Sequence, residues 1–206
     1  MTTTTYPDGT ALVSSALTID EVNRLYQALT CQMLGIDPVS DPLAFSKVRL
    51  DWQRKGQPAY GINDNVTFLR LTEEDDEYDR IRDVSYVTNE DTSVSKVVTF
   101  TRVWRCSWSC YGPASFDAAR LLRSGLLEVD FVHDILATSN LYLLTDIAAS
   151  VRAPEEEDGQ TWERTDIYAK FNEGVVETLG PVATIASVEV LLYDESGLEA
   201  DLQIAI

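Results

Sequence analysis

The residues that could perform acid–base or nucleophilic chemistry centre on one histidine, His133. A catalytic triad needs a nucleophile, a histidine and an acid held together, and no GxSxG signature supplies the nucleophile. The sequence also contains no HExxH helix, no GxxxxGK[ST] phosphate loop and no GxGxxG turn. Because His133 falls in a predicted helix, we interpret it as a surface or packing residue and predict that the chain is not an enzyme.

Two acidic segments, 73–79 and 155–159, are the other candidates for chemistry. The first lacks the alternating oxygen ligands and the central glycine of a calcium loop, so we favour a solvated loop over a metal site. The chain has 34 Asp and Glu residues, and two carboxylates in one turn therefore indicate little. We predict no metal ion and no cofactor.

The three cysteines are Cys31, Cys106 and Cys110. The last two lie in a segment that alternates like a strand, where four residues separate side chains by about 13 Å at ~3.3 Å per residue. Neither a disulfide nor a single metal ion spans that distance. We predict that both are small buried hydrophobic residues.

The charge balance is strongly acidic, with a net charge of −18 at pH 7. Sequence-specific DNA binding depends on Lys and Arg that neutralise phosphates, so we exclude it, whereas a repelling wall around DNA stays open. The start, MTTTTYPDGT, has neither a basic nor an apolar signal region, and no apolar run approaches the ~20 residues of a membrane span. We expect a soluble protein made in the cytoplasm.

Helical periodicity begins at Thr18, a predicted N-cap that forms a capping box with Glu21. Further helices are predicted near 114–126, after Gly112-Pro113, and near 130–137. Short strands are predicted at 47–53, 66–71, 141–144, 162–171 and 186–193, the last as the closing strand. We expect residues 1–17 to be a flexible, irregular N-terminal arm and 18–206 to be one domain.

The clearest alternation runs through 97–111, where Trp104, Cys106, Trp108 and Cys110 share one face. A second stretch, 81–88, precedes it across a polar tip at 89–93, so the two predict a long β-hairpin. A strand of that length often leaves the body of a domain and contacts a neighbour. The predicted fold is therefore α+β, with a mostly antiparallel sheet, a long hairpin and helices packed on one face.

The same region carries a recognisable order of motifs. VVTFTRVWRCSWSCYGPASFDAARLLRSGLL joins a strand to a helix through a YG turn, LYLLTDIAASVRAP follows, and QTWERTDIYAKFN contains Trp162, Arg164 and Asp166 in a Trp-x-Arg-x-Asp arrangement. Over residues 45–195 this order resembles the neck and tail terminator proteins of tailed bacteriophages.

The resemblance implies a structural virion protein, made in the host cytoplasm, that forms a homo-oligomeric and commonly hexameric ring. The ring would cap the tail tube protein and join it to the head-completion or connector protein, with DNA passing through the lumen. It implies no catalytic residue and no membrane. Alternatives are another virion connector or minor tail protein, or, from a different class, a cytosolic binding module or small hydrolase.

Charged residues near the hairpin are the predicted subunit contacts. Arg80, Arg82 and Arg105 are expected to meet acidic residues of the neighbouring copy. The acidic candidates are Glu73, Glu74, Asp75, Asp76, Glu155, Glu156, Glu157 and Asp158.

Replacing His133 with Ala tests the absence of catalysis. The variant particle should keep near-normal infectivity, because no sequence signature gives this imidazole a reaction to perform. Plaque counts of the variant and parental phage, with folding checked by circular dichroism, measure this. A large loss of infectivity in a folded variant would contradict the prediction.

Overall fold

The structure is a computed structural model that describes residues 1–51, 60–75, 77–91, 93–157, 159–182, 187–194 and 197–205. Over these residues nine strands join in one sheet, whose main order is β1-β2-β11-β6-β4-β3. The contact between β3 and β4 is parallel and the others are antiparallel, which confirms the predicted fold class. The strands are β1 (Thr2–Thr5), β2 (Ala11–Ser14), β3 (Val48–Leu50), β4 (Val66–Glu74), β5 (Asp83–Thr88), β6 (Val94–Tyr111), β7 (Leu141–Leu144), β8 (Val151–Arg152) and β11 (Arg164–Val182).

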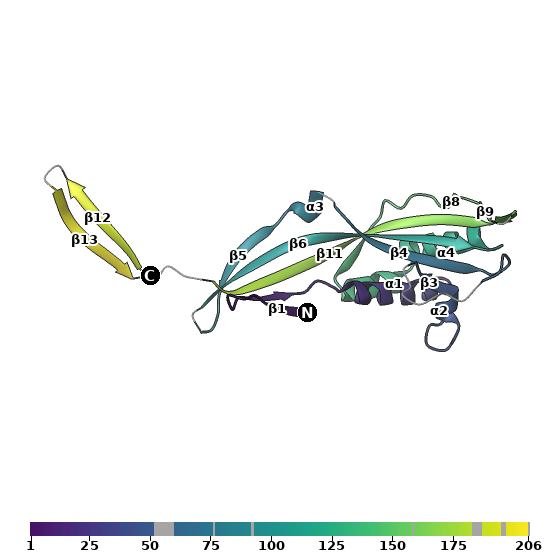
Figure 1. Ribbon diagram of the computed structural model, residues 1–206, viewed down its shortest axis with the longest axis horizontal. Helices are drawn as coiled ribbons and strands as arrows, with labels where there is room; N and C mark the ends of the chain where they lie inside the picture. The colour runs from purple at the N-terminus through teal and green to yellow at the C-terminus, as the bar shows by residue number, and fades with distance from the viewer. Residues whose placement is uncertain are drawn as a thin grey trace.

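The two longest strands form the axis of the molecule. β6 has 18 residues and β11 has 19, and they pair without interruption from Tyr111↔Arg164 to Lys96↔Leu179. At one end β4 joins β6, and we call this part, with its helices, the body. At the other end β5 joins the same edge of β6, and β2 and β1 follow β11; this part is the arm. Figure 1 shows β6 and β11 running through both.

Three longer helices pack on one face of the body: α1 (Ile19–Met33), α4 (Ser115–Glu128) and α5 (Asp130–Thr138). The short helices are α2 (Ala44–Lys47) and α3 (Glu77–Arg80). The predicted capping box at α1 is confirmed, since Thr18 Oγ1 accepts from Glu21 N–H and the Glu21 carboxylate accepts from Thr18 N–H. These caps fix where α1 begins and hence which face it turns to the sheet.

The turn between β6 and α4 requires glycine. Gly112 has φ of +97°, and a Cβ there would lie 2.5 Å from the Asp64 carbonyl oxygen. Any side chain would therefore strain the backbone and collide with the loop before β4. This close approach lets the strand reverse into the helix that covers it.

The core lies between the helices and the matching face of β6 and β11. Trp104, Cys106, Trp108 and Cys110 are all buried, which confirms the predicted alternation. The facing residues of β11 are Phe171, Ala169, Ile167 and Thr165. Trp108 Nε1–H donates to Thr30 Oγ1 at 2.9 Å, so the indole enters the core without an unpaired donor. The cysteines are free thiols.

The N-terminal segment differs from the expectation of irregular backbone. Residues 2–14 form a hairpin, β1–β2, and β2 pairs with β11 from Ser14↔Glu177 to Ala11↔Gly180. The expectation was wrong because a run of threonine shows no alternation, although threonine favours strands. The predicted division into a flexible N-terminal segment, residues 1–17, and one domain, residues 18–206, stays a prediction.

Two strand predictions change in extent. The strand expected at 162–171 continues to Val182, because it follows β6 into the arm. The strand expected at 186–193 forms as β12 (Ser187–Asp194), but it pairs with β13 (Gly197–Ala205) in a separate sheet and does not close the main one. Residue 186, and residues 52–53 of the predicted strand 47–53, lie outside the described residues.

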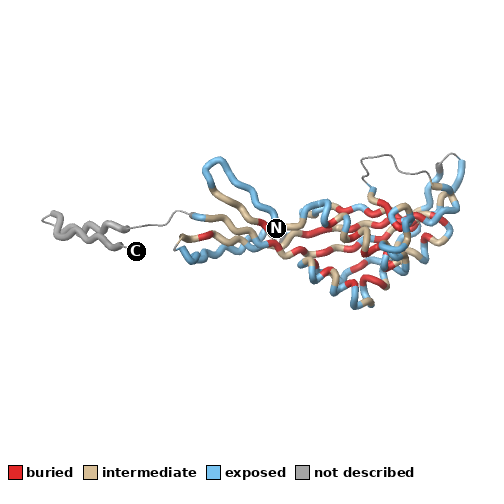
Figure 2. Tube along the Cα trace, turned by 90° about the horizontal axis from the view of Figure 1, so that it is seen from below, coloured by how far each residue is buried: buried red, intermediate tan, exposed pale blue. Residues whose placement is uncertain are grey.

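The long hairpin is confirmed. β5 pairs with β6 from Asp83↔Thr99 to Thr88↔Val94, and Asn89 N–H donates to the Ser93 carbonyl across the tip. Figure 2 shows the buried residues concentrated in the body, with exposed and half-buried residues along the arm. No helix within the described ranges has the length and apolarity that crossing a membrane requires.

Truncating Trp104 to Ala tests this account of the core. Trp104 is buried on the helix-covered face, so the change should cost about 3–5 kcal/mol of unfolding free energy. Phe116 on α4 is half exposed, and Phe116→Ala is the control, with an expected cost within about 1 kcal/mol. Urea unfolding followed by circular dichroism measures both. Equal costs would show that the Trp104 face is not the core.

Candidate assembly surface

The arm is a five-stranded antiparallel sheet in the order β5-β6-β11-β2-β1, with its strands in continuous register. Three adjacent rows cross all five strands. They are Val84-Val98-Glu177-Ser14-Thr2, Ser85-Val97-Thr178-Val13-Thr3 and Tyr86-Lys96-Leu179-Leu12-Thr4. α1, α4 and α5 all pack on the body, so these rows extend beyond the helical layer (Figure 1).

The arm exposes apolar side chains that a compact domain would bury. On β5, Val84, Tyr86 and Val87 are 44%, 65% and 50% exposed, and Val176 on β11 is also exposed. All four residues of β1 and all six of β5 are exposed. An exposed apolar sheet with two open edges is the kind of surface that another protein chain covers.

A buried carboxylate locks the arm to the body where the two meet. Glu173 on β11 is 1% exposed, and its Oε2 accepts from Arg102 Nη2 at 2.7 Å and Trp104 Nε1 at 2.6 Å. Its Oε1 accepts from Leu17 N–H at 2.7 Å, and Arg102 Nη2 also donates to the Leu17 carbonyl. One charge pair thus ties β6, β11 and the segment between β2 and α1 together, and both oxygens of the buried carboxylate accept hydrogen bonds.

Glu173 was missed in the sequence, although a signal for it existed. Ile167, Ala169, Phe171 and Val175 occupy the same face of β11, so Glu173 interrupts an apolar series. A single acid on a buried face implies a buried cationic partner. The partner, Arg102, lies directly opposite Glu173 on the neighbouring strand β6.

The predicted contact arginines have partners within their own chain. Arg105 Nε lies 2.5 Å from the Glu74 carboxylate, which also pairs with Lys170 Nζ at 2.6 Å. Arg80 pairs with Asp75 at 2.6 Å on the surface. The structure therefore brings these predicted residues together inside one subunit, and their role between subunits stays a prediction.

Arg82 and the second acidic segment lie apart from each other. The Arg82 guanidinium stacks over the Phe100 ring on the arm, 3.8 Å from its centroid. Glu155, Glu156 and Glu157 form β9 (Glu155–Glu157), which pairs with β10 (Gln160–Trp162) at the end of the body away from the arm (Figure 1). Asp76 and Asp158 lie outside the described residues, and Glu73 precedes Glu74, the last residue of β4.

The Trp-x-Arg-x-Asp segment joins the end of β10, at Trp162, to the start of β11, at Arg164 and Asp166. Arg164 pairs with Asp166 at 2.8 Å and with Glu155, and the hydrogen bond that its guanidinium donates to Asp166 raises the pKa of the guanidinium. Tyr111 O–H donates to Glu155 at 3.0 Å, while partial burial raises the pKa of that phenol. The segment thus fastens the β9–β10 hairpin to the body and is structural.

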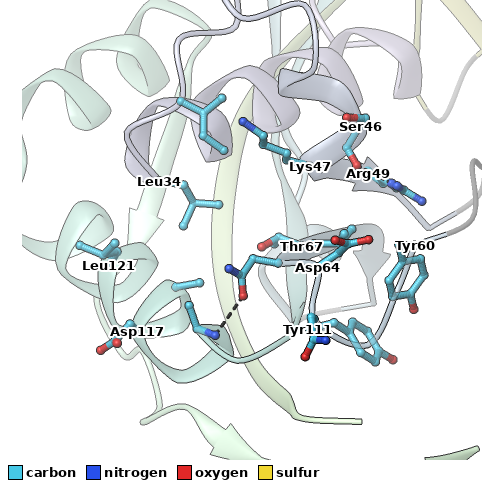
Figure 3. Close-up of a pocket in the computed structure, with 16 residues that line it drawn as sticks. Leu34, Ser46, Lys47, Arg49, Tyr60, Asp64, Thr67, Tyr111, Asp117 and Leu121 are labelled. Atoms are coloured by element: carbon cyan, nitrogen blue, oxygen red, sulfur yellow. Dashed lines mark hydrogen bonds between the residues drawn. The ribbon is translucent and has the colours of Figure 1, made fainter.

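Two hollows flank the body. One, of about 590 Å³, has Leu34 and Leu121 on one side and Tyr60 and Tyr111 on the other (Figure 3). The larger, of about 1080 Å³, lies on the sheet face and is lined in part by Arg70, Arg105 and Arg164. His133 lines neither hollow and is exposed on α5. Among the described residues no three His, Cys, Asp or Glu side chains gather as metal ligands would.

Comparison with known proteins adds one finding. The family model described as "Phage neck terminator protein" matches residues 20–195, which is most of the chain. The search of curated proteins found no match to the chain. The family match confirms the resemblance predicted from the strand–turn–helix and Trp-x-Arg-x-Asp segments, and this family is one of structural virion proteins.

Replacing Glu173 with Ala tests the lock between arm and body. The change leaves Arg102 and the Trp104 indole N–H without their acceptor, so we expect a loss of about 3–5 kcal/mol of unfolding free energy. Glu177→Ala is the control, because the Glu177 carboxylate accepts a long hydrogen bond of 3.4 Å from Ser14 Oγ, and the change should cost about 1 kcal/mol or less. Urea titrations of both variants provide the comparison, and similar losses would contradict a special role for Glu173.

Proposed function

The chain belongs to the phage neck terminator protein family, and on this premise we propose that it is a ring-forming subunit of the virion neck. In this proposal the ring caps the tail tube and joins it to the head-completion or connector protein. We propose a hexamer, following the resemblance to tail terminators, and no catalytic role.

The observation that carries the proposal is the uncovered arm. The body has its own helical layer and core, whereas the arm extends beyond them with exposed apolar residues and two open edges. A head-to-tail contact, in which one surface of a copy meets a different surface of the next, closes into a ring when the rotation between copies fits. In such a ring every arm is covered and none is left over.

The charge of the chain suits a DNA conduit. The net charge of −18 per chain gives a hexamer of this chain about six times that charge before counterions bind. Phosphates are repelled by such a wall, so DNA passes without being held by sequence or by strong backbone contacts. Tight binding of DNA would oppose the transfer that a neck must permit.

We propose that the charges at the base of the arm select register and contribute little to affinity. Exposed ion pairs are worth ~0–1 kcal/mol, and Arg105 and Arg80 are already paired within the chain. In the ring, these arginines would pair with acidic residues of the neighbouring copy, including Glu73, Glu155 or Glu156. Such pairs affect the choice of binding partner more than the affinity.

Shortening the hairpin tests the proposal. Replacing residues 86–96 with Asn-Gly joins Ser85 to Val97, which face each other across the ladder, through a two-residue hairpin turn. The body core is untouched, so we expect a folded monomer that forms no ring and does not complete tails. Sedimentation velocity, native mass spectrometry and a tail-completion assay provide the measurements.

The control for this variant is Glu90→Ala, which alters the tip and keeps the length of the arm. It should assemble like the parent chain. If the shortened protein still forms rings and completes tails, the hairpin is not the assembly element. A parent chain that stays monomeric with tail tubes, and instead shows a ligand-filled hollow, would favour a binding module.

A further inference from the structure

β1 and β5 are the two open edges of the arm, and neither carries the usual protection of an edge strand. Natural proteins blunt such edges with charges, prolines or bulges. Thr2–Thr5 contains threonine alone, and β5 has one charge, Asp83, at its first position. Both ladders to the neighbouring strands are regular, without a bulge.

The two edges lie level with each other along the arm. The rows of the sheet place Thr2 in line with Val84, Thr3 with Ser85 and Thr4 with Tyr86. Four strand spacings separate the two edges, which amounts to about 19 Å at ~4.8 Å each. Each copy therefore presents matching open edges on opposite sides of one sheet.

The direction of the strands decides how two copies can join. Every contact across the arm is antiparallel, so directions alternate and β1 runs the same way as β5. Rotation about a ring axis that lies along the strands keeps strand direction. We propose that β1 of one copy pairs with β5 of the next in a parallel joint, so that the arms form a sheet continuous around the ring.

The occupant that fits these edges is a second copy, an inference that rests on the proposed ring. Each copy supplies one β1 edge and one β5 edge, so pairing them leaves no edge open after closure. The side chains are compatible, because β-branched threonine beside valine and tyrosine is a favourable cross-strand combination. No charge of either edge lies between Val84 and Thr88 or within β1, so copies of the same sign can approach there.

Cysteine pairs test the joint. Thr4→Cys is combined in turn with Ser85→Cys, Tyr86→Cys and Val87→Cys in the full chain, which samples the register of the joint. Within one chain the two sites lie about 19 Å apart, whereas disulfides need Cα atoms about 4.4–6.8 Å apart, so every such bond links two copies.

The native thiols do not interfere with this experiment. Cys31, Cys106 and Cys110 are buried, and burial raises the pKa of Cys31 and of Cys110 to about 11. Mild oxidation of assembled rings should give a ladder of covalent multimers in at least one combination. The single variants, carrying one new cysteine each, should give no ladder beyond a dimer.

The outcomes separate this joint from the proposed function. Rings that form normally but give no ladder in any combination overturn the β1–β5 joint and leave the neck subunit standing. A parent chain that forms no ring with tail tubes overturns both. A ladder in any one combination supports the joint.

Adding a charge to the β5 edge is a second, independent test of the β1–β5 joint. Tyr86→Lys places a charge on β5, where the side chain is exposed, so we expect the variant to fold like the parent chain. The midpoint concentration of ring assembly should rise at least about tenfold, since lost pairing weakens every contact of the ring. Tyr142→Lys, on β7 of the body and similarly exposed, is the matched control and should assemble normally. Equal behaviour of the two variants would overturn the proposal.

Discussion

The pairing of β6 with β11 is the interaction on which the rest of this structure depends. In the body the ladder supplies the floor of the core, with Trp104 opposite Phe171 and Trp108 opposite Ile167. The same two strands then continue past the helical layer and become the centre of the arm. The arm is therefore held by an uninterrupted backbone ladder, and the Glu173–Arg102 pair fixes the point at which covered sheet becomes uncovered sheet.

The body and the arm are stabilised by different contributions to the free energy of folding. Burial of aromatic and aliphatic side chains stabilises the body, at ~25 cal/mol per Å² of apolar surface. The arm has few such contacts beyond Val175, and a short two-stranded ribbon alone would be marginal. Five strands in register, anchored in a folded body, remain ordered while still exposing apolar residues. Such a sheet is suited to completion by a neighbour, because its order does not have to be gained on binding.

What could be read from the sequence depended on how regular each pattern is. The alternation around Trp104 to Cys110 and the Thr18–Glu21 capping box are local signals, and both gave the observed element. Thr2–Thr5 carries no alternation, and its place is set by pairing through β2 with Glu177 to Gly180, far along the chain. Charged residues such as Arg105 are conspicuous in sequence, yet their partners, Glu74 here, depend on which strands lie side by side. The hairpin predicted from the sequence thus located the candidate surface, but the sequence did not show which other strands and residues belong to it.

In the proposed ring, the contacts between acidic subunits must form despite the electrostatic repulsion between the subunits. Each copy carries −18, and like charges on facing surfaces would oppose closure. Salt limits this repulsion to about 8 Å at physiological ionic strength, so it is the charges at the contact itself that matter. The open edges at Thr2–Thr5 and Val84–Thr88 are uncharged, while the acidic β9 strand lies at the far end of the body. Backbone hydrogen bonds between such edges do not weaken as counterions are added, whereas the opposing repulsion does. In the proposed ring, this separation of the acidic strand from the open edges would let each copy repel DNA and still pair with its neighbours.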